Sequence, residues 1–300
     1  MRCYSGLVDG VIIVDKPEGL TSHDVVNRMR RLANTRKVGH LGTLDPMATG
    51  VLPLVLGRAT RLAQFFSSAE KTYDAWVQFG WATDTYDREG ARISEPVVPQ
   101  FTRAELELAL EQFRGTILQT PPPFSAKKIA GTPAYRLARK NIAVEMKPVE
   151  VTVFALDLAE FDGTTARIRV RCSAGTYLRG IAHDVGQQLG YGAFLTALRR
   201  TVSGEFSESQ ARTLQALEDL ARGGALDQAV IPVSSVLPEI PNATVDALTA
   251  GQIRHGKDFR LSPFVERAGA KYVKALGPDG DLIAIGEARM PNLYHPVLVL

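Results

Sequence analysis

The stretch Gly39-His-Leu-Gly-Thr-Leu-Asp45-Pro-Met-Ala-Thr-Gly50 is the most distinctive part of the chain. Three glycines and one Asp-Pro pair fall within these twelve residues, a density that is typical of a loop made of tight turns. Asp45 fits the first position of a type I turn, with Pro46 at the second position. Turn chemistry alone leaves two interpretations of Asp45 open, a structural turn residue or a functional carboxylate.

Regular secondary structure is predicted on both sides of this loop. The run Val-Ile-Ile-Val predicts a short buried strand at Gly10–Asp15. Thr21 or Ser22 can cap a helix that runs to about Leu32. Because strands and helices follow one another without regular βαβ units, the pattern favours an α+β fold with a mixed or antiparallel sheet. Further strands are expected at Lys71–Gly80 and Thr165–Cys172, and helices at Thr102–Phe113 and Thr176–Leu189.

Arginines mark two of these elements. In the strand at Thr165–Cys172 they alternate with apolar residues, which predicts one face in the core and one in solvent. In the helix that follows, Arg179 lies in the first turn, where a cation opposes the helix dipole and suggests a carboxylate partner. The alternating residues are Arg167, Arg169 and Arg171 on one face and Ile168, Val170 and Cys172 on the other.

The end of the chain predicts a small second domain. Prolines cluster between Pro232 and Pro241, as in a linker, so we divide the chain into residues 1–237 and 238–300. In the second part we expect a helix near Thr244–Ile253, a hairpin around Pro278-Asp279-Gly280 and a last strand at Val297–Leu300. It also carries a basic patch formed by Arg254, His255, Lys257 and Arg260.

Composition limits the class of protein. Three hundred residues with 45% hydrophobic content are enough for a full core. The apolar runs fall far short of the ~20 residues that span a bilayer, and residues 1–6 lack the apolar stretch of a secretory signal. Two cysteines, Cys3 and Cys172, make neither a disulfide framework nor a zinc site. We therefore expect a soluble cytoplasmic protein without a membrane partner.

Charge is unevenly distributed, although the net charge is only +3. No acidic residue lies between Asp24 and Asp45, or from Gln112 to Val144. Two cationic segments of this kind suggest contact with a polyanion, and a solvated surface remains the alternative for each alone. Their basic residues are Arg28, Arg30, Arg31, Arg36 and Lys37 in the first, and Arg114, Lys127, Lys128, Arg136, Arg139 and Lys140 in the second.

Several blocks, taken in order, resemble the TruB family of tRNA pseudouridine synthases. The first runs from Gly10 to Ser22 and contains Asp-Lys-Pro-Glu-Gly, and the second runs from Gly39 to Thr60. The resemblance covers about residues 10–205, and residues 238–300 resemble the PUA-type RNA-binding module of the family. The later blocks are Lys71-Thr-Tyr-Asp74, Ala82-Thr-Asp-Thr85, the insertion Pro121–Asn141, Arg171-Cys-Ser-Ala-Gly-Thr-Tyr-Leu-Arg179 and Leu198-Arg-Arg200.

The resemblance implies a pseudouridine synthase fold with helices flanking the sheet, and a mostly β PUA-like domain after it. An insertion at about residues 119–145 is expected to act as a thumb that grips RNA. The implied reaction isomerises the uridine at position 55 in the T loop, so the partner is the T arm of tRNA. This isomerisation needs no metal or cofactor, and we expect a monomer that requires no protein partner.

The resemblance also assigns catalytic residues. Asp45 is implied as the nucleophile, a role that suits a carboxylate because it is already ionised at neutral pH. Arg179 would keep Asp45 ionised inside a base-sized pocket. Tyr73 would stack on the uracil, and its hydroxyl would help to exchange the C5 proton. Attack at C6 of the base and attack at C1′ of the ribose both remain open.

Four further residues are assigned to substrate binding, because the target base must be flipped out of the RNA. His40 is implied beside the flipped nucleotide, with Tyr177 and Leu198 lining the pocket, although Leu198 also fits an ordinary core residue. Lys16 is expected to support the site. Two positions depart from the family pattern: Phe124 stands where a tyrosine is usual, and Arg61 where a lysine is common.

Other functions remain as alternatives. A subunit of a guide-RNA-dependent pseudouridylation complex would share the catalytic domain, and often lacks the insertion at Pro121–Asn141. A non-catalytic RNA-folding protein predicts damage at Asp45, Tyr73 or Arg179, and all three are intact. A small-molecule hydrolase with an Asp nucleophile would leave the cationic segments unexplained. A stand-alone tRNA-modifying enzyme is the interpretation that the sequence favours.

Overall fold

The computed structural model describes residues 9–122, 124–125, 127–129, 132–133, 146–262 and 270–300. Cys3, most of the predicted thumb insertion and the basic residues Arg136, Arg139 and Lys140 lie outside these ranges. Within the insertion, β6 (Lys128–Ile129) and β7 (Thr132–Pro133) pair antiparallel.

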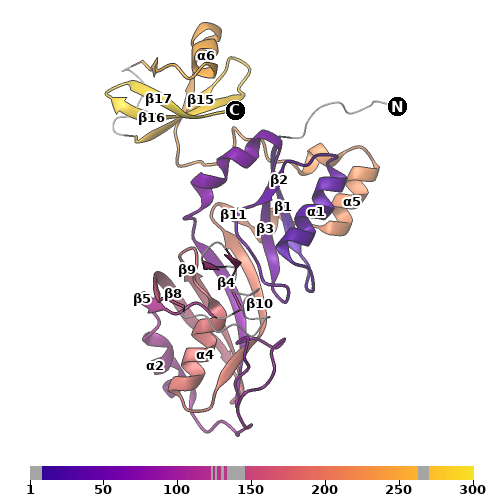
Figure 1. Cartoon of the computed structure of the whole chain (residues 1–300), viewed down its shortest axis with the longest axis vertical. Helices are drawn as coiled ribbons and strands as arrows, with labels where there is room; N and C mark the ends of the chain where they lie inside the picture. The colour runs from indigo at the N-terminus through magenta and orange to yellow at the C-terminus, as the bar shows by residue number, and fades with distance from the viewer. Residues whose placement is uncertain (1–8, 123, 126, 130–131, 134–145, 263–269) are drawn as a thin grey trace.

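One large mixed sheet forms the frame of the molecule (Figure 1). Its strand order is β12-β1-β3-β10-β4-β9-β8-β5, with β2 added to β3 and β11 added to β10. The pairs β1–β12 and β3–β10 are parallel and the other pairs are antiparallel, which confirms the predicted mixed sheet. The strands are β1 (Gly10–Lys16), β2 (Val38–His40), β3 (Thr49–Leu56), β4 (Lys71–Phe79), β5 (Gly115–Gln119), β8 (Val149–Phe161), β9 (Thr165–Cys172), β10 (Ala193–Ser203), β11 (Phe206–Ser207) and β12 (Arg212–Thr213).

Helices cover this sheet in two pairs, as Figure 1 shows. The pair α1 (Ser22–Leu32) and α5 (Leu214–Arg222) packs beside β1 and β2, and the pair α2 (Arg103–Glu111) and α4 (Leu178–Gln188) packs on β8, β4 and β10. Between the helices and the sheet lies the main apolar core. The described part of the chain also has 3-10 segments at η1 (Gly57–Phe66), η2 (Glu208–Gln210) and η3 (Leu226–Ala229). No helix among the described residues is both long and apolar enough to cross a membrane.

The beginning of α1 shows why the predicted helix starts where it does. Thr21 is the N-cap: its hydroxyl accepts a hydrogen bond of 3.1 Å from the backbone N–H of Asp24. The Asp24 carboxylate in turn accepts one of 2.9 Å from the Thr21 backbone N–H. This reciprocal capping box satisfies two N–H groups that the first turn of a helix leaves without partners.

Strand β9 confirms the predicted alternation. Its apolar residues Ile168, Val170 and Cys172 are at most 1% exposed and join the main core. The opposite face carries ion pairs, including Arg169 with Asp74 at 3.0 Å and Arg171 with Glu70 at 2.7 Å. The solvent-facing side of β9 therefore carries a row of ion pairs. Cys172 is a free thiol, and burial raises its pKa to about 11.

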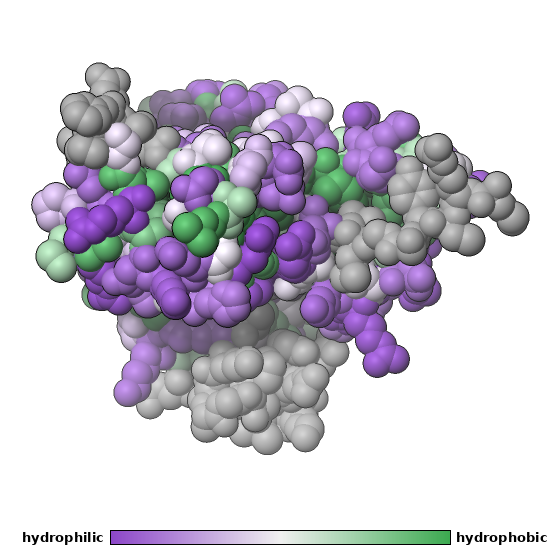
Figure 2. Space-filling model, turned by 90° about the horizontal axis from the view of Figure 1, so that it is seen from above, coloured by the Kyte–Doolittle hydropathy of each residue, from purple (hydrophilic) through white to green (hydrophobic). Residues whose placement is uncertain are grey.

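A second sheet follows, with the order β13-β15-β16-β17-β14 and its own apolar core. It lies at one end of the molecule next to η1 (Figure 1), and Leu282, Ile285 and Leu298 share a second apolar cluster with β1 and η1. Seen from this end, hydrophilic residues cover most of the visible surface, with small hydrophobic groups between them (Figure 2). The elements are β13 (Asn242–Thr244), α6 (Ala247–Arg254), β14 (Phe259–Arg260), β15 (Tyr272–Leu276), β16 (Leu282–Met290) and β17 (Leu293–Val299).

The predicted hairpin is confirmed in this second sheet, because β15 and β16 pair antiparallel on either side of Pro278-Asp279-Gly280. The last strand, expected at Val297–Leu300, begins earlier and is β17. Arg61 on η1 donates to the carbonyl oxygen of Val299, so this arginine ties the second sheet to the first part of the chain.

Candidate active site around Asp45 and Arg179

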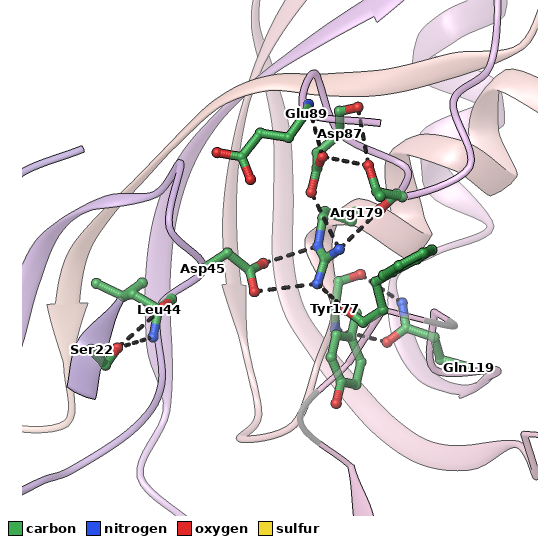
Figure 3. A network of polar contacts seen from close by, with 10 residues as sticks. Ser22, Leu44, Asp45, Asp87, Glu89, Gln119, Tyr177 and Arg179 are labelled. Carbon is green, nitrogen blue, oxygen red and sulfur yellow. Dashed lines mark hydrogen bonds and ion pairs between the residues drawn. The ribbon is translucent and has the colours of Figure 1, made fainter. Parts of the chain in front are cut away.

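Asp45 lies in the loop between β2 and β3, and polar side chains hold this loop on one side. The Ser22 hydroxyl accepts from the backbone N–H of Leu44 at 2.8 Å and donates to the Leu44 carbonyl at 3.1 Å (Figure 3). Lys16, which is fully buried, donates from Nζ to the carbonyls of Pro46 at 3.1 Å and Ala48 at 2.6 Å. The backbone on both sides of Asp45 is therefore fixed before any substrate arrives.

Arg200 holds the other side of the same loop. This side chain on β10 is 1% exposed, and its guanidinium donates to the carbonyls of Val51 at 2.7 Å and Gly42 at 3.1 Å. Gly50 pairs with Arg200 in the parallel β3–β10 contact and has φ of +98°. A Cβ at Gly50 would lie 2.2 Å from the Arg200 carbonyl oxygen, so only glycine fits there.

Arg179 is the centre of the polar network (Figure 3). Its Nη2 donates to Asp45 Oδ1 at 3.2 Å, and its Nε lies 2.9 Å from Asp45 Oδ2 as an ion pair. On the other side, Nη1 donates to the Thr85 carbonyl at 3.0 Å and to Asp87 Oδ2 at 3.3 Å. Nη2 also donates to the Phe124 carbonyl at 2.9 Å. The predicted carboxylate partner of Arg179 is confirmed as Asp45, and the structure adds Asp87 as a second.

The two carboxylates differ in their access to solvent. The side chain of Asp45 is 34% exposed, whereas those of Arg179 and Asp87 are only 5% and 6% exposed. Desolvation of the Asp45 carboxylate raises its pKa above the ordinary value of 3.8, and the Arg179 guanidinium opposes this rise. Of the two carboxylates, Asp45 is therefore the one that a substrate can reach. The Arg179 guanidinium favours the charged form of Asp45.

A cavity of about 730 Å³ opens at this pair. Its wall includes six of the seven residues singled out from the sequence, so chain segments far apart in sequence converge on one space. A second cleft of about 580 Å³ also borders this pair and shares His40, Asp45 and Arg179 with the first. Lys16 lines neither cavity and supports the loop through its hydrogen bonds to the backbone carbonyls. The six residues are His40, Asp45, Tyr73, Tyr177, Arg179 and Leu198.

The apolar wall of the larger cavity comes from the central strands. Tyr73 on β4 is 8% exposed and Leu198 on β10 is 7% exposed. Burial raises the pKa of the Tyr73 hydroxyl, which keeps it protonated, and the nearby Arg200 opposes that rise. His40, at the end of β2, has a buried Nδ1 without a hydrogen-bond partner among the described residues. Burial also lowers the pKa of His40 and favours its neutral ring.

Tyr177 is held at the start of α4 by a residue that the sequence analysis did not single out. The side-chain amide of Gln119 donates to the Tyr177 carbonyl at 2.8 Å and accepts from the Tyr177 backbone N–H at 2.8 Å. Gln119 is 2% exposed and ends β5, at the start of the predicted insertion. In Figure 3 Gln119 lies beside Tyr177, and Arg179 lies above it.

Asp87 and Arg200 were also missed as site residues. Asp87 lies just beyond the block Ala82–Thr85, and Arg200 belongs to the block Leu198–Arg200, but neither was given a role. A signal existed for Asp87, because a first-turn arginine in a buried site needs more than one acceptor. Within the described residues, no three His, Cys, Asp or Glu side chains gather in a way that could hold a metal ion.

Comparisons with known proteins agree on one family. Residues 30–178 match the model of the TruB family pseudouridylate synthase N-terminal domain, and residues 179–238 match that of the tRNA pseudouridylate synthase B C-terminal domain. A protein of Solibacter usitatus named tRNA pseudouridine synthase B is 58% identical over 98% of this chain and all of its own length. A protein of the same name from Aquifex aeolicus is 39% identical over 94% of this chain and 96% of its own length.

Solved structures extend the likeness. A chain in the crystal structure of a Cbf5-Nop10-Gar1 complex is 30% identical with a TM-score of 0.72, covering 94% of this chain and 79% of its own. A chain in the structure of an H/ACA RNP bound to a substrate RNA containing 2′-deoxyuridine is 26% identical, with a TM-score of 0.72, covering 97% of this chain and 84% of its own. With the two family models and the full-length relatives, these findings show that the chain belongs to the TruB family of tRNA pseudouridylate synthases.

Proposed function

We propose that this enzyme isomerises the uridine at position 55 in the T loop of tRNA, with Asp45 as the nucleophile. The observation that carries the proposal is the Asp45–Arg179 pair. Its carboxylate faces a cavity of about 730 Å³, while its guanidinium is buried behind it. This arrangement provides a charged nucleophile inside a space of the size that binds small molecules or single nucleotides.

The reaction breaks the N1–C1′ bond and forms a C5–C1′ bond on the same uracil. A carboxylate attacks without a separate base, provided that a neighbouring charge keeps it ionised in the cavity. In the proposed reaction Asp45 forms and then releases a covalent bond either to C6 of the base or to C1′ of the ribose. The proton on C5 leaves after the new bond has formed, N1 takes up a proton in its place, and the Tyr73 hydroxyl, in the same cavity lining, assists that exchange.

The cavity lining suits a flipped-out uridine. The ring of Tyr73 and the side chain of Leu198 supply apolar walls on which a base can lie. His40 borders both hollows beside Asp45, where it can contact the flipped nucleotide. Lys127 also lines the larger cavity, and its charge can meet a backbone phosphate.

RNA binding beyond the cavity is assigned to two parts of the chain. The insertion at about 119–145 is proposed as a thumb, and residues 238–300 as a PUA-like RNA-binding domain next to the catalytic domain 1–237. Because RNA loops and ends are read by shape and by splayed bases, two separate contact regions suit a folded T arm. We further propose that the enzyme acts as a cytoplasmic monomer, without a protein partner or cofactor.

A test uses a T-arm RNA hairpin with tritium at C5 of the uracil. Wild-type protein alone, without metal, nucleotide or guide RNA, is expected to release tritium and to form pseudouridine at position 55. Asp45→Asn should bind the hairpin but release none, since an amide is a poor nucleophile. Asp74→Asn is the matched control, because Asp74 pairs with Arg169 on the solvent face of the sheet.

Two outcomes would reject parts of the proposal. Tritium release that appears only with a guide RNA and partner proteins would favour the guide-dependent alternative. Tight binding with no release under any condition would favour the non-catalytic RNA-folding alternative.

A further inference from the structure

The turn that follows β4 contains a strained residue next to the active-site pair. Tyr86 has a φ of +64°, in the left-handed region. L-residues with large side chains rarely adopt this conformation, because Cβ crowds the backbone there. The Tyr86 carbonyl accepts from the Leu195 N–H at 3.0 Å. A strained residue persists only where its surroundings hold it, and such residues concentrate at functional sites.

The contact that holds Tyr86 is a ring stack on His183. The two ring centroids are 3.8 Å apart and the ring planes differ by 15°. His183 follows Arg179 by four residues on α4, so the two side chains leave the same face of the helix. The Nδ1 of His183 is buried and has no hydrogen-bond partner among the described residues. Packing against Tyr86 therefore positions this ring.

The neighbours of Tyr86 are the two residues that hold Nη1 of Arg179. The Thr85 carbonyl lies 3.0 Å from this nitrogen, and Asp87 Oδ2 lies 3.3 Å from it. The other carboxylate oxygen of Asp87 accepts from the Thr85 hydroxyl at 2.6 Å. Any shift of the Tyr86 backbone would thus move both acceptors of Arg179 Nη1 together.

We infer that Tyr86 and His183 form an aromatic clamp that positions Arg179 against Asp45. Helix α4 contacts the turn at two points. The Arg179 guanidinium donates hydrogen bonds to Thr85 and Asp87, and the His183 ring stacks on Tyr86. Neither ring lines the two cavities, so the clamp acts through Arg179 and does not touch RNA in the site. The inference rests on the proposed role of Asp45.

Four variants test the clamp by tritium release from the T-arm hairpin. His183→Ala removes the stack, and His183→Phe keeps a planar ring without the imidazole. Tyr86→Asn removes the ring from the other side, with a residue that tolerates positive φ. Tyr191→Ala is the control, because the Tyr191 ring contacts Phe101 at a centroid distance of 5.5 Å beyond the end of the same helix. For each variant kcat, KM, the pH dependence of kcat and Tm are measured.

We expect His183→Ala and Tyr86→Asn to lower kcat by about ten- to a hundredfold, since small misplacement of a catalytic group has effects of that size. KM should stay within about twofold of the wild-type value, because RNA contacts are unchanged. The acid limb of kcat should move to higher pH, since a displaced Arg179 opposes the raised pKa of Asp45 less well. In His183→Phe, kcat and the acid limb of its pH profile should return to the wild-type values. Tyr191→Ala should lower Tm without moving the acid limb.

Two results would overturn the clamp alone. One is a wild-type kcat and acid limb in His183→Ala, measured beside an inactive Asp45→Asn. The other is a His183→Phe enzyme as slow as His183→Ala, which would mean that the imidazole itself is needed. Tritium release by Asp45→Asn would instead overturn the proposed nucleophile, and the clamp with it.

Discussion

The Nζ atom of Lys16 donates a hydrogen bond of 2.6 Å to the carbonyl oxygen of Ala48, three residues beyond Asp45. The same amine reaches the carbonyls of Pro17 at 2.9 Å and Pro46 at 3.1 Å. One buried cation therefore joins the end of β1 to the loop that carries the proposed nucleophile. Lys16 is a support of the loop and lines neither cavity.

Replacing Lys16 by methionine should damage both stability and catalysis. Lys16→Met leaves buried carbonyls without donors, so we expect a loss of roughly 3 kcal/mol in the free energy of unfolding, together with a lower kcat. Urea denaturation and single-turnover tritium release measure the two effects. Lys274→Met is the matched control, because Lys274 is 2% exposed and donates to the carbonyls of Ser234 and Val236 far from the site. A similar fall in kcat in both variants would contradict the local role of Lys16.

The stability contribution of Lys16 should depend on pH. Burial lowers its pKa from 10.5 to about 8, so between these values the unfolded chain binds more protons at this residue than the folded chain. Stability that depends on Lys16 should therefore rise as the pH increases from about 8 to 10.5. The check is the difference in unfolding free energy between wild type and Lys16→Met, measured across this range. A difference that is constant or shrinks towards high pH would be inconsistent with a buried, partly desolvated amine.

Catalysis should fail on the acid side because of Asp45. Burial raises the pKa of this carboxyl above 3.8, so Asp45 takes up a proton, and loses nucleophilicity, at a pH higher than an exposed aspartate would. Single-turnover rates should fall as the pH decreases through that raised pKa. In Arg179→Lys the fall should begin at a higher pH, since a lysine cannot keep both contacts with the carboxylate. An identical acid limb in both enzymes would separate Arg179 from the ionisation of Asp45.

Asp87→Asn should reduce kcat and stability together. The change leaves the buried Arg179 with Asp45 as its remaining carboxylate contact, and removing one partner of a buried ion pair costs about 3–5 kcal/mol. Asparagine keeps one acceptor oxygen, so the loss should fall at the lower end of that range. Glu107→Gln, which removes one partner of an exposed ion pair with Arg103 on α2, is expected to cost at most about 1 kcal/mol. Chemical denaturation of the two variants decides the comparison, and equal losses would argue against a structural pair at Asp87.

Tyr73→Phe separates the ring of this residue from its hydroxyl. The phenylalanine ring can fill the same place on β4, so the affinity for the hairpin should be unchanged. Without the hydroxyl, we expect kcat and tritium release to fall by about a hundredfold or more, the range of general acid–base assistance. Filter binding and single-turnover kinetics measure the two properties. Normal turnover in Tyr73→Phe would restrict the residue to stacking.

Sequence patterns predicted those elements that depend on interactions between residues close together in the chain. The capping box at Thr21 and the alternation along β9 are visible in sequence, because each depends on residues that are near neighbours in the chain. Strand β10 was not predicted, and its register shows why. Bulges between Leu195 and Ala197, and between Arg200 and Val202, interrupt the period-two pattern in the strand that carries Leu198.

The site residues divide in the same way into those that the sequence indicates and those that become apparent only in the folded chain. Asp45, Tyr73 and Arg179 stand in blocks that resemble a known family, so they were singled out and they meet in one cavity. Gln119 and Asp87 act through contacts that join segments 58 and 92 residues apart. No spacing rule connects such pairs, because the sheet and α4 bring them together only in the folded chain.

The hydrogen bond from Arg179 to residue 124 ends on a backbone carbonyl, at 2.9 Å. Every amino acid carries that oxygen, so mutation at this position can change the side chain that lines the second cleft while the arginine keeps its acceptor. Phenylalanine in place of the family's usual tyrosine then changes the side chain and leaves the backbone carbonyl that Arg179 contacts unchanged. The lining of the second cleft can therefore vary at residue 124 without disturbing the hydrogen bond that this residue accepts from Arg179.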